Sequence, residues 1–145
     1  MSLKRLSCRA VMFAVLTMAV GCGGESEPVY PVRGKVLFQG KPIEGASVVF
    51  LSTAARKPKV GEPTPQATTN ASGEYSLTSY KEGDGALPGD YGVAISWMEV
   101  TGPSDNPERE VRRDRLGGRY ADPAKSGLTA TVQEDATEVP PFDLK

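Results

Sequence analysis

The chain has 145 residues, enough for about one domain, and its 16 glycines and 12 prolines are typical of a turn-rich globular protein. Its formal net charge of -1 gives no basic field of the kind that attracts nucleic acid. The chain contains no histidine, which excludes catalytic triads, histidine–cysteine dyads and zinc sites built on imidazole. Both cysteines, Cys8 and Cys22, lie near the N-terminus, so no disulfide crosslinks the body of the chain.

The first segment has the pattern of an export signal. Basic residues precede an apolar run over residues 10–20 that only Thr17 interrupts. This run is about half of the roughly 20 residues that a membrane-spanning helix needs, and it is typical of a signal peptide. Small residues lead into Cys22, as in the lipobox of bacterial lipoproteins, although Ala19 stands where that motif usually has leucine. The pattern predicts that Cys22 is acylated and becomes the first residue of the mature chain.

This pattern divides the chain into three parts. Residues 1–21 are predicted to be a lipoprotein signal peptide, residues 22–29 a flexible tether of small and polar residues, and residues 30–145 the folded domain. The expected location is extracytoplasmic, on the periplasmic or cell-surface face of a bacterial membrane that acyl chains on Cys22 hold. An ordinary secretory signal cleaved near Gly21, or an uncleaved anchor, are the alternatives.

From Tyr30 onwards the apolar residues alternate with a period of two, which indicates strands. In the clearest strand, Tyr91, Val93, Ile95 and Trp97 share one face, which predicts that Trp97 is a core residue rather than a platform for a sugar. The pattern predicts an all-β protein with a single seven-stranded antiparallel β-sandwich. The expected strands are 32–38, 46–51, 66–69, 74–78, 91–100, 128–132 and 142–145.

Two long loops separate these strands. Residues 53–66 contain three prolines and no periodicity, and residues 101–126 form a second, longer surface loop. One short helix is expected within it at about 106–116, because Asn106 and Pro107 form a helix start and Gly117 follows the last turn.

Four stretches of the domain carry a resemblance. They read Val32-x-Gly34-x-Val36, Gly40-Lys41-Pro42-Ile43-x-Gly45-Ala46-x-Val48, Thr69-Asn70-Ala71-Ser72-Gly73-Glu74-Tyr75-x-Leu77 and Pro88-Gly89-Asp90-Tyr91-x-Val93. In this order they resemble the carboxypeptidase regulatory-like domain, whose fold is a transthyretin-like (prealbumin-like) Greek-key sandwich of seven strands. Residues 119–132 and 142–144 resemble the closing strands of small lipoproteins common in planctomycete bacteria. The resemblance implies a fold and no activity, because the matching positions are turn glycines and core residues.

The sequence offers few candidates for chemistry. Related sandwiches that act as enzymes depend on histidines, so we expect no enzyme activity, no cofactor and no metal site. Glu82, Asp84 and Asp90 lack the alternating oxygen ligands of a calcium loop and are interpreted as a solvated turn. The densest basic group has acidic residues interleaved with it, which favours a self-neutralised surface over a contact with an anionic partner. The candidate contact residues are Tyr80, Arg112, Arg113, Arg115, Arg119 and Tyr120.

Three classes of function remain open. The favoured one is a non-catalytic, lipid-anchored β-sandwich of the cell envelope that acts as a structural or protein-interaction module. The alternative is an extracytoplasmic module that binds polysaccharide or peptide through the loops 53–66 and 101–126. An enzyme is the least favoured class. Besides the membrane, the expected partner is an envelope protein or a polysaccharide. Binding to nucleic acid is not expected.

Overall fold

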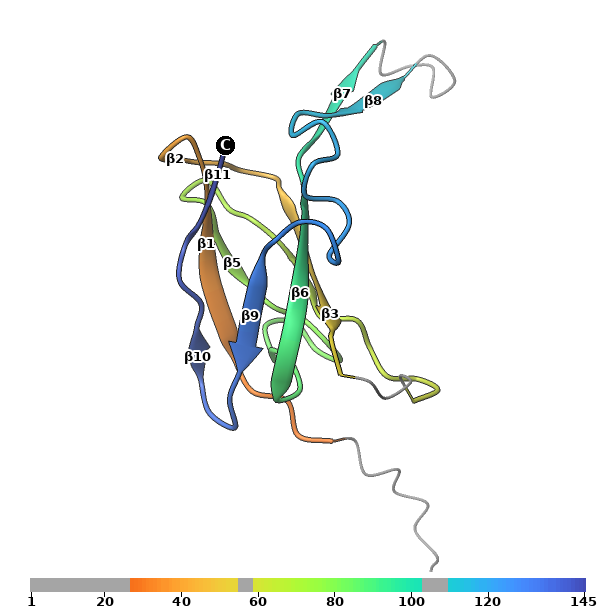
Figure 1. The fold of residues 1–145 in the computed structure, drawn as a ribbon, viewed down its shortest axis with the longest axis vertical. Helices are drawn as coiled ribbons and strands as arrows, with labels where there is room; N and C mark the ends of the chain where they lie inside the picture. The colour runs from red at the N-terminus through yellow and green to blue at the C-terminus, as the bar shows by residue number, and fades with distance from the viewer. Residues whose placement is uncertain (1–26, 55–58, 103–109) are drawn as a thin grey trace, which may run out of the picture.

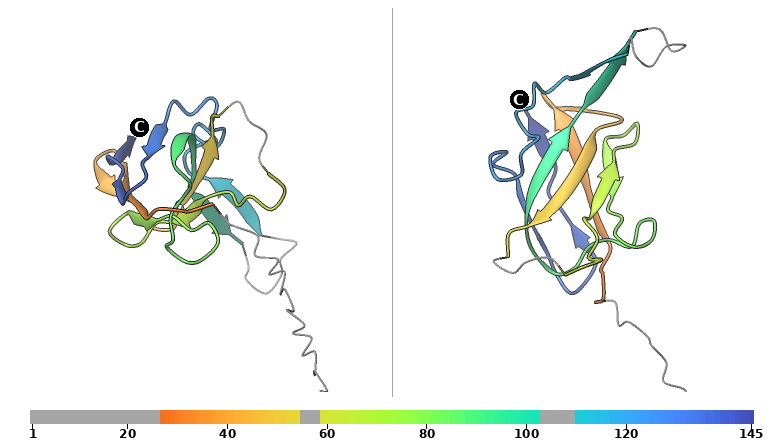
Figure 2. Two further views of the ribbon diagram at one scale, coloured as in Figure 1. Left: turned by 90° about the horizontal axis from the view of Figure 1, so that it is seen from below. Right: turned by 90° about the vertical axis from the view of Figure 1, so that its right-hand side faces the viewer.

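The computed structural model describes residues 27–54, 59–102 and 110–145. In these residues the protein is all-β: two sheets pack face to face as a β-sandwich, and a two-stranded ribbon extends from one end (Figures 1 and 2). The predicted signal peptide and Cys22 lie outside the described residues, as does the tether up to residue 26. The first described pairing of the chain is the bridge between Tyr30 and Ala86.

The first sheet is organised around one central strand, β1. β5 and β2 pair with β1 in the antiparallel sense, whereas β10 and β11 pair with it in the parallel sense. Parallel pairing is possible here because the chain reaches β10 from the other sheet rather than through a hairpin. The strands of this sheet are β1 (Val32–Phe38), β2 (Lys41–Pro42), β5 (Glu74–Ser76), β10 (Thr137–Glu138) and β11 (Phe142–Leu144).

The second sheet has the strand order β4-β3-β6-β9 and is antiparallel throughout. Its longest pairing joins β3 to β6, from Ser47 opposite Ser96 to Ser52 opposite Tyr91. The strands of this sheet are β3 (Ser47–Ser52), β4 (Gln66–Thr68), β6 (Gly89–Ser96) and β9 (Thr129–Val132).

The core lies between the two sheets and follows the alternation of the sequence. Burying such aliphatic and aromatic side chains removes apolar surface from water, which is the main stabilising term in a domain without crosslinks. The largest fully buried side chains are Phe50, Leu77, Ile95, Leu144, Val32, Val36, Val48 and Val93.

The edge of β6 beyond β9 and its outer face are covered as well, by the second half of the segment that we expected to be a surface loop. Backbone hydrogen bonds join Ile95 N–H to Tyr120 O (2.8 Å) and Val93 N–H to Leu128 O (2.9 Å). Gly92 fits beneath this segment because a Cβ there would lie 2.9 Å from the carbonyl oxygen of Pro123. Both faces of β6 are therefore buried in its central part.

Several sequence predictions need correction. The all-β sandwich is confirmed, but the described residues form eleven strands rather than seven, and not all pairings are antiparallel. The expected strand 91–100 is divided at Trp97 into β6 and β7 (Met98–Thr101). The predicted helix is wrong where the structure describes it, because Val111–Asp114 form strand β8, which pairs with β7. Its first part, residues 106–109, lies outside the described residues.

One core residue combines burial with an unsatisfied polar group. Tyr75 is 4% exposed, and among the described residues its hydroxyl has no hydrogen-bond partner. Its ring lies over Gly34, where a Cβ would come within 2.4 Å of the hydroxyl oxygen. Burial raises the pKa of the Tyr75 hydroxyl well above the ordinary value of 10.0.

Tyr75→Phe should therefore raise the free energy of unfolding by about 1 kcal/mol, because it removes a buried hydroxyl that gains nothing from the fold. The wild-type protein should also lose stability as the pH rises above about 10, since the unfolded chain releases this proton while the folded chain keeps it. Urea unfolding at pH 7 to 11 measures both effects. Tyr80→Phe is the control, because Tyr80 is 45% exposed. A less stable Tyr75→Phe variant at pH 7 would mean that the hydroxyl has a partner.

Candidate interaction site

The ribbon formed by β7 (Met98–Thr101) and β8 (Val111–Asp114) is the most distinctive surface feature, and we call these eight residues the arm. Seven of them are exposed, and Asp114 is half-buried. The strands pair from Met98 opposite Asp114 to Thr101 opposite Val111. Figures 1 and 2 show the arm projecting beyond the sandwich, at the end opposite to that where the chain enters at residue 27.

Trp97 holds the root of the arm. Its ring contacts Phe38 at a centroid separation of 6.1 Å and lies under the guanidinium of Arg115, 3.6 Å from the ring centroid. Its Nε1–H donates to the carbonyl oxygen of Glu44 at 2.9 Å. Trp97 is only partly buried and packs against the edge of the core, rather than lying between the sheets as its position in the sequence had predicted.

Asp114 fixes the root from the other strand. Its carboxylate accepts hydrogen bonds from the backbone N–H groups of Trp97, Leu116 and Gly118, each at 3.0 Å. Because the N–H of Trp97 bonds to this side chain, the regular ladder of β6 stops there and the chain turns out of the sandwich as β7. Trp97 and Asp114 together hold the arm in a defined orientation.

The arm concentrates exposed apolar side chains. Six large hydrophobic residues are exposed in the described part of the chain, and three of them, Met98, Val100 and Val111, lie on the arm. Met98 and Val100 share one face of the ribbon, and Val111 lies on the other. A cluster of exposed apolar side chains beside charged ones is typical of a surface that contacts another molecule.

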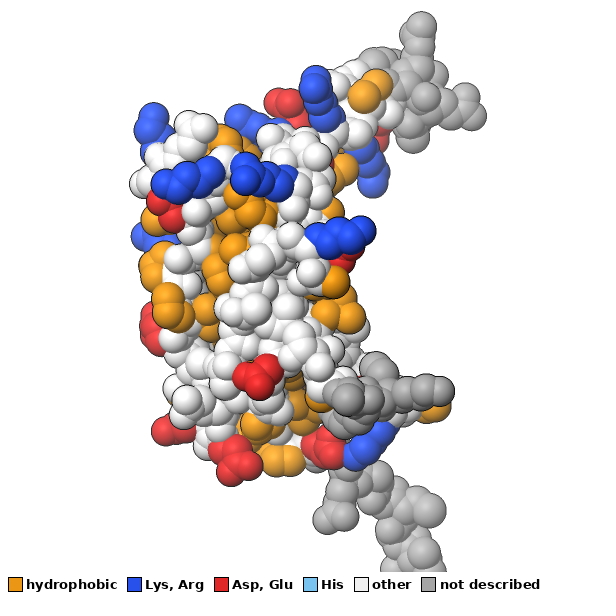
Figure 3. Space-filling model, viewed as in Figure 1, with side chains coloured by type: hydrophobic (Ala, Val, Ile, Leu, Met, Phe, Trp, Pro, Cys, Tyr) orange, Lys and Arg blue, Asp and Glu red, His pale blue; other side chains and the backbone are white. Residues whose placement is uncertain are grey.

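The arginines that the sequence analysis named as candidate contact residues lie on or near this end of the protein. Arg112 and Arg113 lie on β8, Arg115 stacks on Trp97, and Arg119 donates to the carbonyl oxygen of Lys145 at 3.3 Å. On the face drawn in Figure 3, most Lys and Arg side chains lie towards the arm end and most Asp and Glu side chains towards the other end. The structure thus brings the arginines to one end of the protein, but it spreads them over the arm, its root and the sandwich.

The two tyrosines among the candidate contact residues do not lie with the arginines on one exposed surface. Tyr120 is 8% exposed and its hydroxyl accepts from the N–H of Lys145, so the expectation that its ring is available to a ligand is wrong. Tyr80 is exposed, but it follows Ser79, which lines a pocket with Ser52 and Tyr91 at the end of β6 away from the arm. The arm contributes instead Met98, Val100 and Val111, which the sequence interpretation had not singled out.

Of the two loops of the ligand-binding alternative, residues 53–66 and the arm, which contains the first part of residues 101–126, lie at opposite ends of β6. The loop that follows β3 leaves at Ser52, opposite Tyr91, whereas the arm begins beyond Ser96. Tyr91 and Ser96 are separated by roughly 17 Å, because a strand rises about 3.3 Å per residue. Residues 53–66 and the arm therefore do not form one continuous binding surface.

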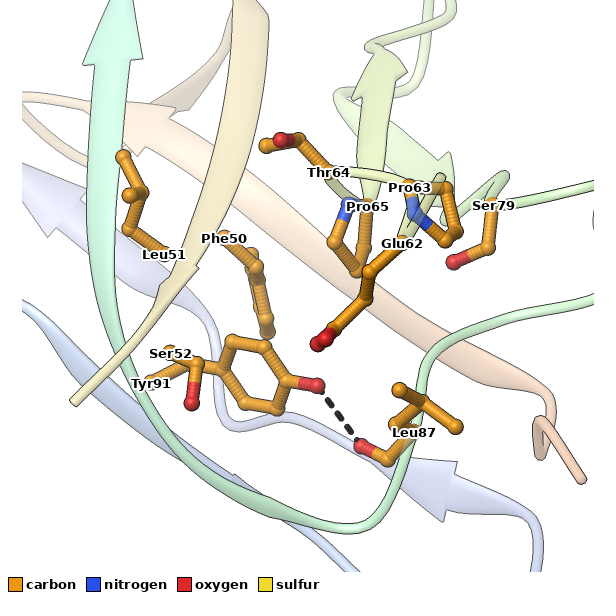
Figure 4. A pocket seen from close by; sticks show the side chains of 10 residues that line it. All are labelled: Phe50, Leu51, Ser52, Glu62, Pro63, Thr64, Pro65, Ser79, Leu87 and Tyr91. Atoms are coloured by element: carbon orange, nitrogen blue, oxygen red, sulfur yellow. Dashed lines mark hydrogen bonds between the residues drawn. The ribbon is translucent and has the colours of Figure 1, made fainter. Parts of the chain in front are cut away.

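A small pocket lies beside the first of these loops (Figure 4). Its volume is about 90 Å³, well below the several hundred Å³ typical of sites for drug-sized ligands. The hydroxyl of Tyr91 donates to the carbonyl oxygen of Leu87 at 2.8 Å, and the Glu62 carboxylate points into the pocket. The lining residues are Phe50, Leu51, Ser52, Glu62, Pro63, Thr64, Pro65, Ser79, Leu87 and Tyr91.

Asp84 organises the turn that carries Tyr80. Its carboxylate accepts from the backbone N–H groups of Ser79, Tyr80 and Lys81 at 2.8 to 3.0 Å. Burial alone would raise the pKa of the Asp84 carboxyl, but these hydrogen bonds outweigh it and hold the pKa below its usual value. The carboxylate shapes the turn, and no cluster of three or more metal-ligating side chains is found among the described residues.

Comparisons with known proteins give little further guidance. No protein family and no curated protein matches the sequence. A solved structure that the fold is similar to is a 9R-lipoxygenase from Cyanothece PCC8801, with 13% identity and a TM-score of 0.43 over 81% of this chain and 16% of that chain. This likeness is too distant to support an inference about function. Within the described ranges, no helix has the length and hydropathy needed to cross a membrane.

Proposed function

We propose that this chain is a non-catalytic, lipid-anchored β-sandwich of the bacterial cell envelope that acts as a protein-interaction module through the arm. The observation that carries the proposal is the arm itself: a ribbon with exposed apolar side chains on both faces, which Trp97 and Asp114 hold in a defined orientation. A two-stranded ribbon is only marginally stable alone. The contacts of Trp97 and Asp114 that hold the root of the arm therefore favour a role in presenting its exposed residues to a partner. We also propose that the chain belongs to the carboxypeptidase regulatory-like family, and this assignment rests on the sequence resemblance.

The position of the arm supports the proposed anchoring. The chain enters the sandwich at the end opposite to the arm (Figure 1). A chain tethered through acyl groups on Cys22 would therefore present the arm on the side away from its attachment point. The second candidate, a module that binds polysaccharide or peptide, has less support, because the pocket of about 90 Å³ beside Tyr91 is much smaller than such a ligand.

Cys22→Ser should abolish acylation and release the protein from the membrane fraction, because the thiol is the proposed attachment point of the lipid. Metabolic labelling with a fatty-acid analogue, followed by fractionation, measures both effects. Cys8→Ser is the matched control and should keep the label, since Cys8 lies within the predicted signal peptide. Label retained by Cys22→Ser would contradict the anchoring.

The interaction role is tested in cells that carry a photo-crosslinking residue at a single position. Placed at Val100 on the arm, it should give a discrete crosslinked product. Placed at Leu51, which is 47% exposed against 54% for Val100, it should give none. Equal crosslinking at both positions, or none at Val100, would contradict the arm as the interaction surface.

A further inference from the structure

The outer edge of β8 has unpaired backbone groups. Arg115 N–H donates to the carbonyl oxygen of Trp97 at 2.8 Å. Because opposed residues in an antiparallel ribbon alternate between hydrogen-bonded and non-hydrogen-bonded pairs, the ladder continues through Glu99 opposite Arg113. The N–H and C=O of Arg112 therefore point away from β7. In the described part of the chain this sheet has only the two strands, so nothing there pairs with this edge.

Two arginines flank this open edge. Arg112 and Arg113 are consecutive and so project from opposite faces of the strand. Arg112 has a long ion pair with Glu110 (3.8 Å), and its side chain remains 71% exposed. Arg113 lies opposite Glu99 in the register but forms no ion pair with any described residue. Both guanidinium groups are thus available to carboxylates on either face of an added strand.

The same charges disfavour two registers in which a second copy of this chain could pair with that edge. If β8 paired with itself about a two-fold axis centred on Arg112 or on Arg113, that arginine would face its own copy. Like charges directly opposite each other destabilise a sheet, and charged residues on an edge are a common protection against self-pairing. A strand with the opposite charge meets no such repulsion.

We propose that an extended acidic segment of a partner protein adds to the outer edge of β8 as a third strand. This inference rests on the proposed function of the arm and names the chemistry of its partner. Two successive acidic residues of the segment face Arg112 and Arg113, and an apolar residue faces Val111, which is 60% exposed. Backbone hydrogen bonds to Arg112 provide the pairing, and the carboxylates provide the selectivity.

The test uses the full-length protein in detergent and a fluorescent peptide with the central sequence Glu-Glu-Val flanked by threonines. Fluorescence anisotropy should show binding that weakens at least tenfold in the double variant Arg112→Glu/Arg113→Glu. That variant should instead bind the corresponding Lys-Lys-Val peptide, which the wild-type protein should not bind. Lys81→Glu makes the same type of charge change on the turn after β5 and should leave binding unchanged.

A peptide with N-methyl groups on its central residues separates strand addition from charge attraction alone. It keeps both carboxylates but cannot donate the backbone hydrogen bonds, so its binding should be lost. Equal binding of the N-methylated peptide, or of the Glu-Glu-Val peptide by the charge-reversed variant, would overturn the proposal. No binding of the acidic peptide, together with specific crosslinking at Val100, would reject the acidic strand and leave the proposed function of the arm standing.

Discussion

Replacing Thr69 by valine should lower the free energy of unfolding by about 2–6 kcal/mol, although the two side chains have nearly the same shape. Thr69 is 3% exposed and is the buried polar residue of the described part of the chain. Its hydroxyl donates to the carbonyl oxygen of Ile43 at 2.7 Å and accepts from the N–H of Ala46 at 2.9 Å. Valine would leave both backbone groups buried without a partner, at a cost of about 1–3 kcal/mol each.

Thr69→Ser is the control that isolates the hydroxyl. It keeps both hydrogen bonds and removes one methyl group, so it should cost about 1 kcal/mol. Urea denaturation followed by the fluorescence of Trp97, the single tryptophan of the chain, measures both variants. A Thr69→Val variant as stable as Thr69→Ser would show that the hydrogen bonds to the 43–46 segment contribute little.

Thr69 also shows that the alternation of residues predicts which face of a strand is buried, but not which distant residues its side chains contact. Residues 66–69 read as a short polar strand, and the structure forms β4 (Gln66–Thr68) there. Alternation places Ala67 and Thr69 on the same face, which is the face that turns inwards. The sequence could not show that Thr69 joins the end of β4 to Ile43 and Ala46, because this contact spans more than twenty residues and depends on how the chain crosses between the sheets.

Alternation also made the core strands predictable, but it did not reveal strand β8 of the arm. A buried strand such as β1 or β3 alternates between the core and the surface, and this pattern is visible in the sequence. β7 continues the alternation of β6 with Met98 and Val100, but β8 has no such pattern, because Val111 is its one apolar residue. The local signals that remained, Asn106, Pro107 and Gly117, are typical of helix ends, but cross-strand pairing with β7 outweighs them in residues 111–114.

The candidate site shows the same limits. The basic residues of the arm could be found from composition alone, because arginines are dense in that part of the sequence. Their arrangement depends on Asp114, whose carboxylate bonds to three backbone N–H groups across the root. Tyr120 was misjudged because it lies in a segment without strand periodicity, yet that segment docks along β6 and buries the ring.

Trp97→Ala should lower the free energy of unfolding by about 2–3 kcal/mol, less than the roughly 3–5 kcal/mol expected for a tryptophan buried between the sheets. The ring is partly buried, so less apolar surface is lost, but its packing on Phe38 and the stacking of Arg115 disappear with it. Since this variant has no tryptophan, circular dichroism should follow its unfolding.

The same substitution should loosen the arm more than the sandwich. Hydrogen exchange should speed up at the backbone amides of β7 and β8, whereas the amides of β3 and β6 should change only with the global stability. Trp97→Phe keeps a smaller ring against Phe38 and Arg115 and loses the hydrogen bond to Glu44, so it should cost about 1 kcal/mol and keep the arm protected. A loss below about 0.5 kcal/mol for Trp97→Ala, as at an ordinary surface position, would contradict the role of Trp97 at the root. Unchanged exchange in the arm would mean that the Asp114 carboxylate and the backbone hydrogen bond from Arg115 to Trp97, which the substitution does not remove, are enough to hold it.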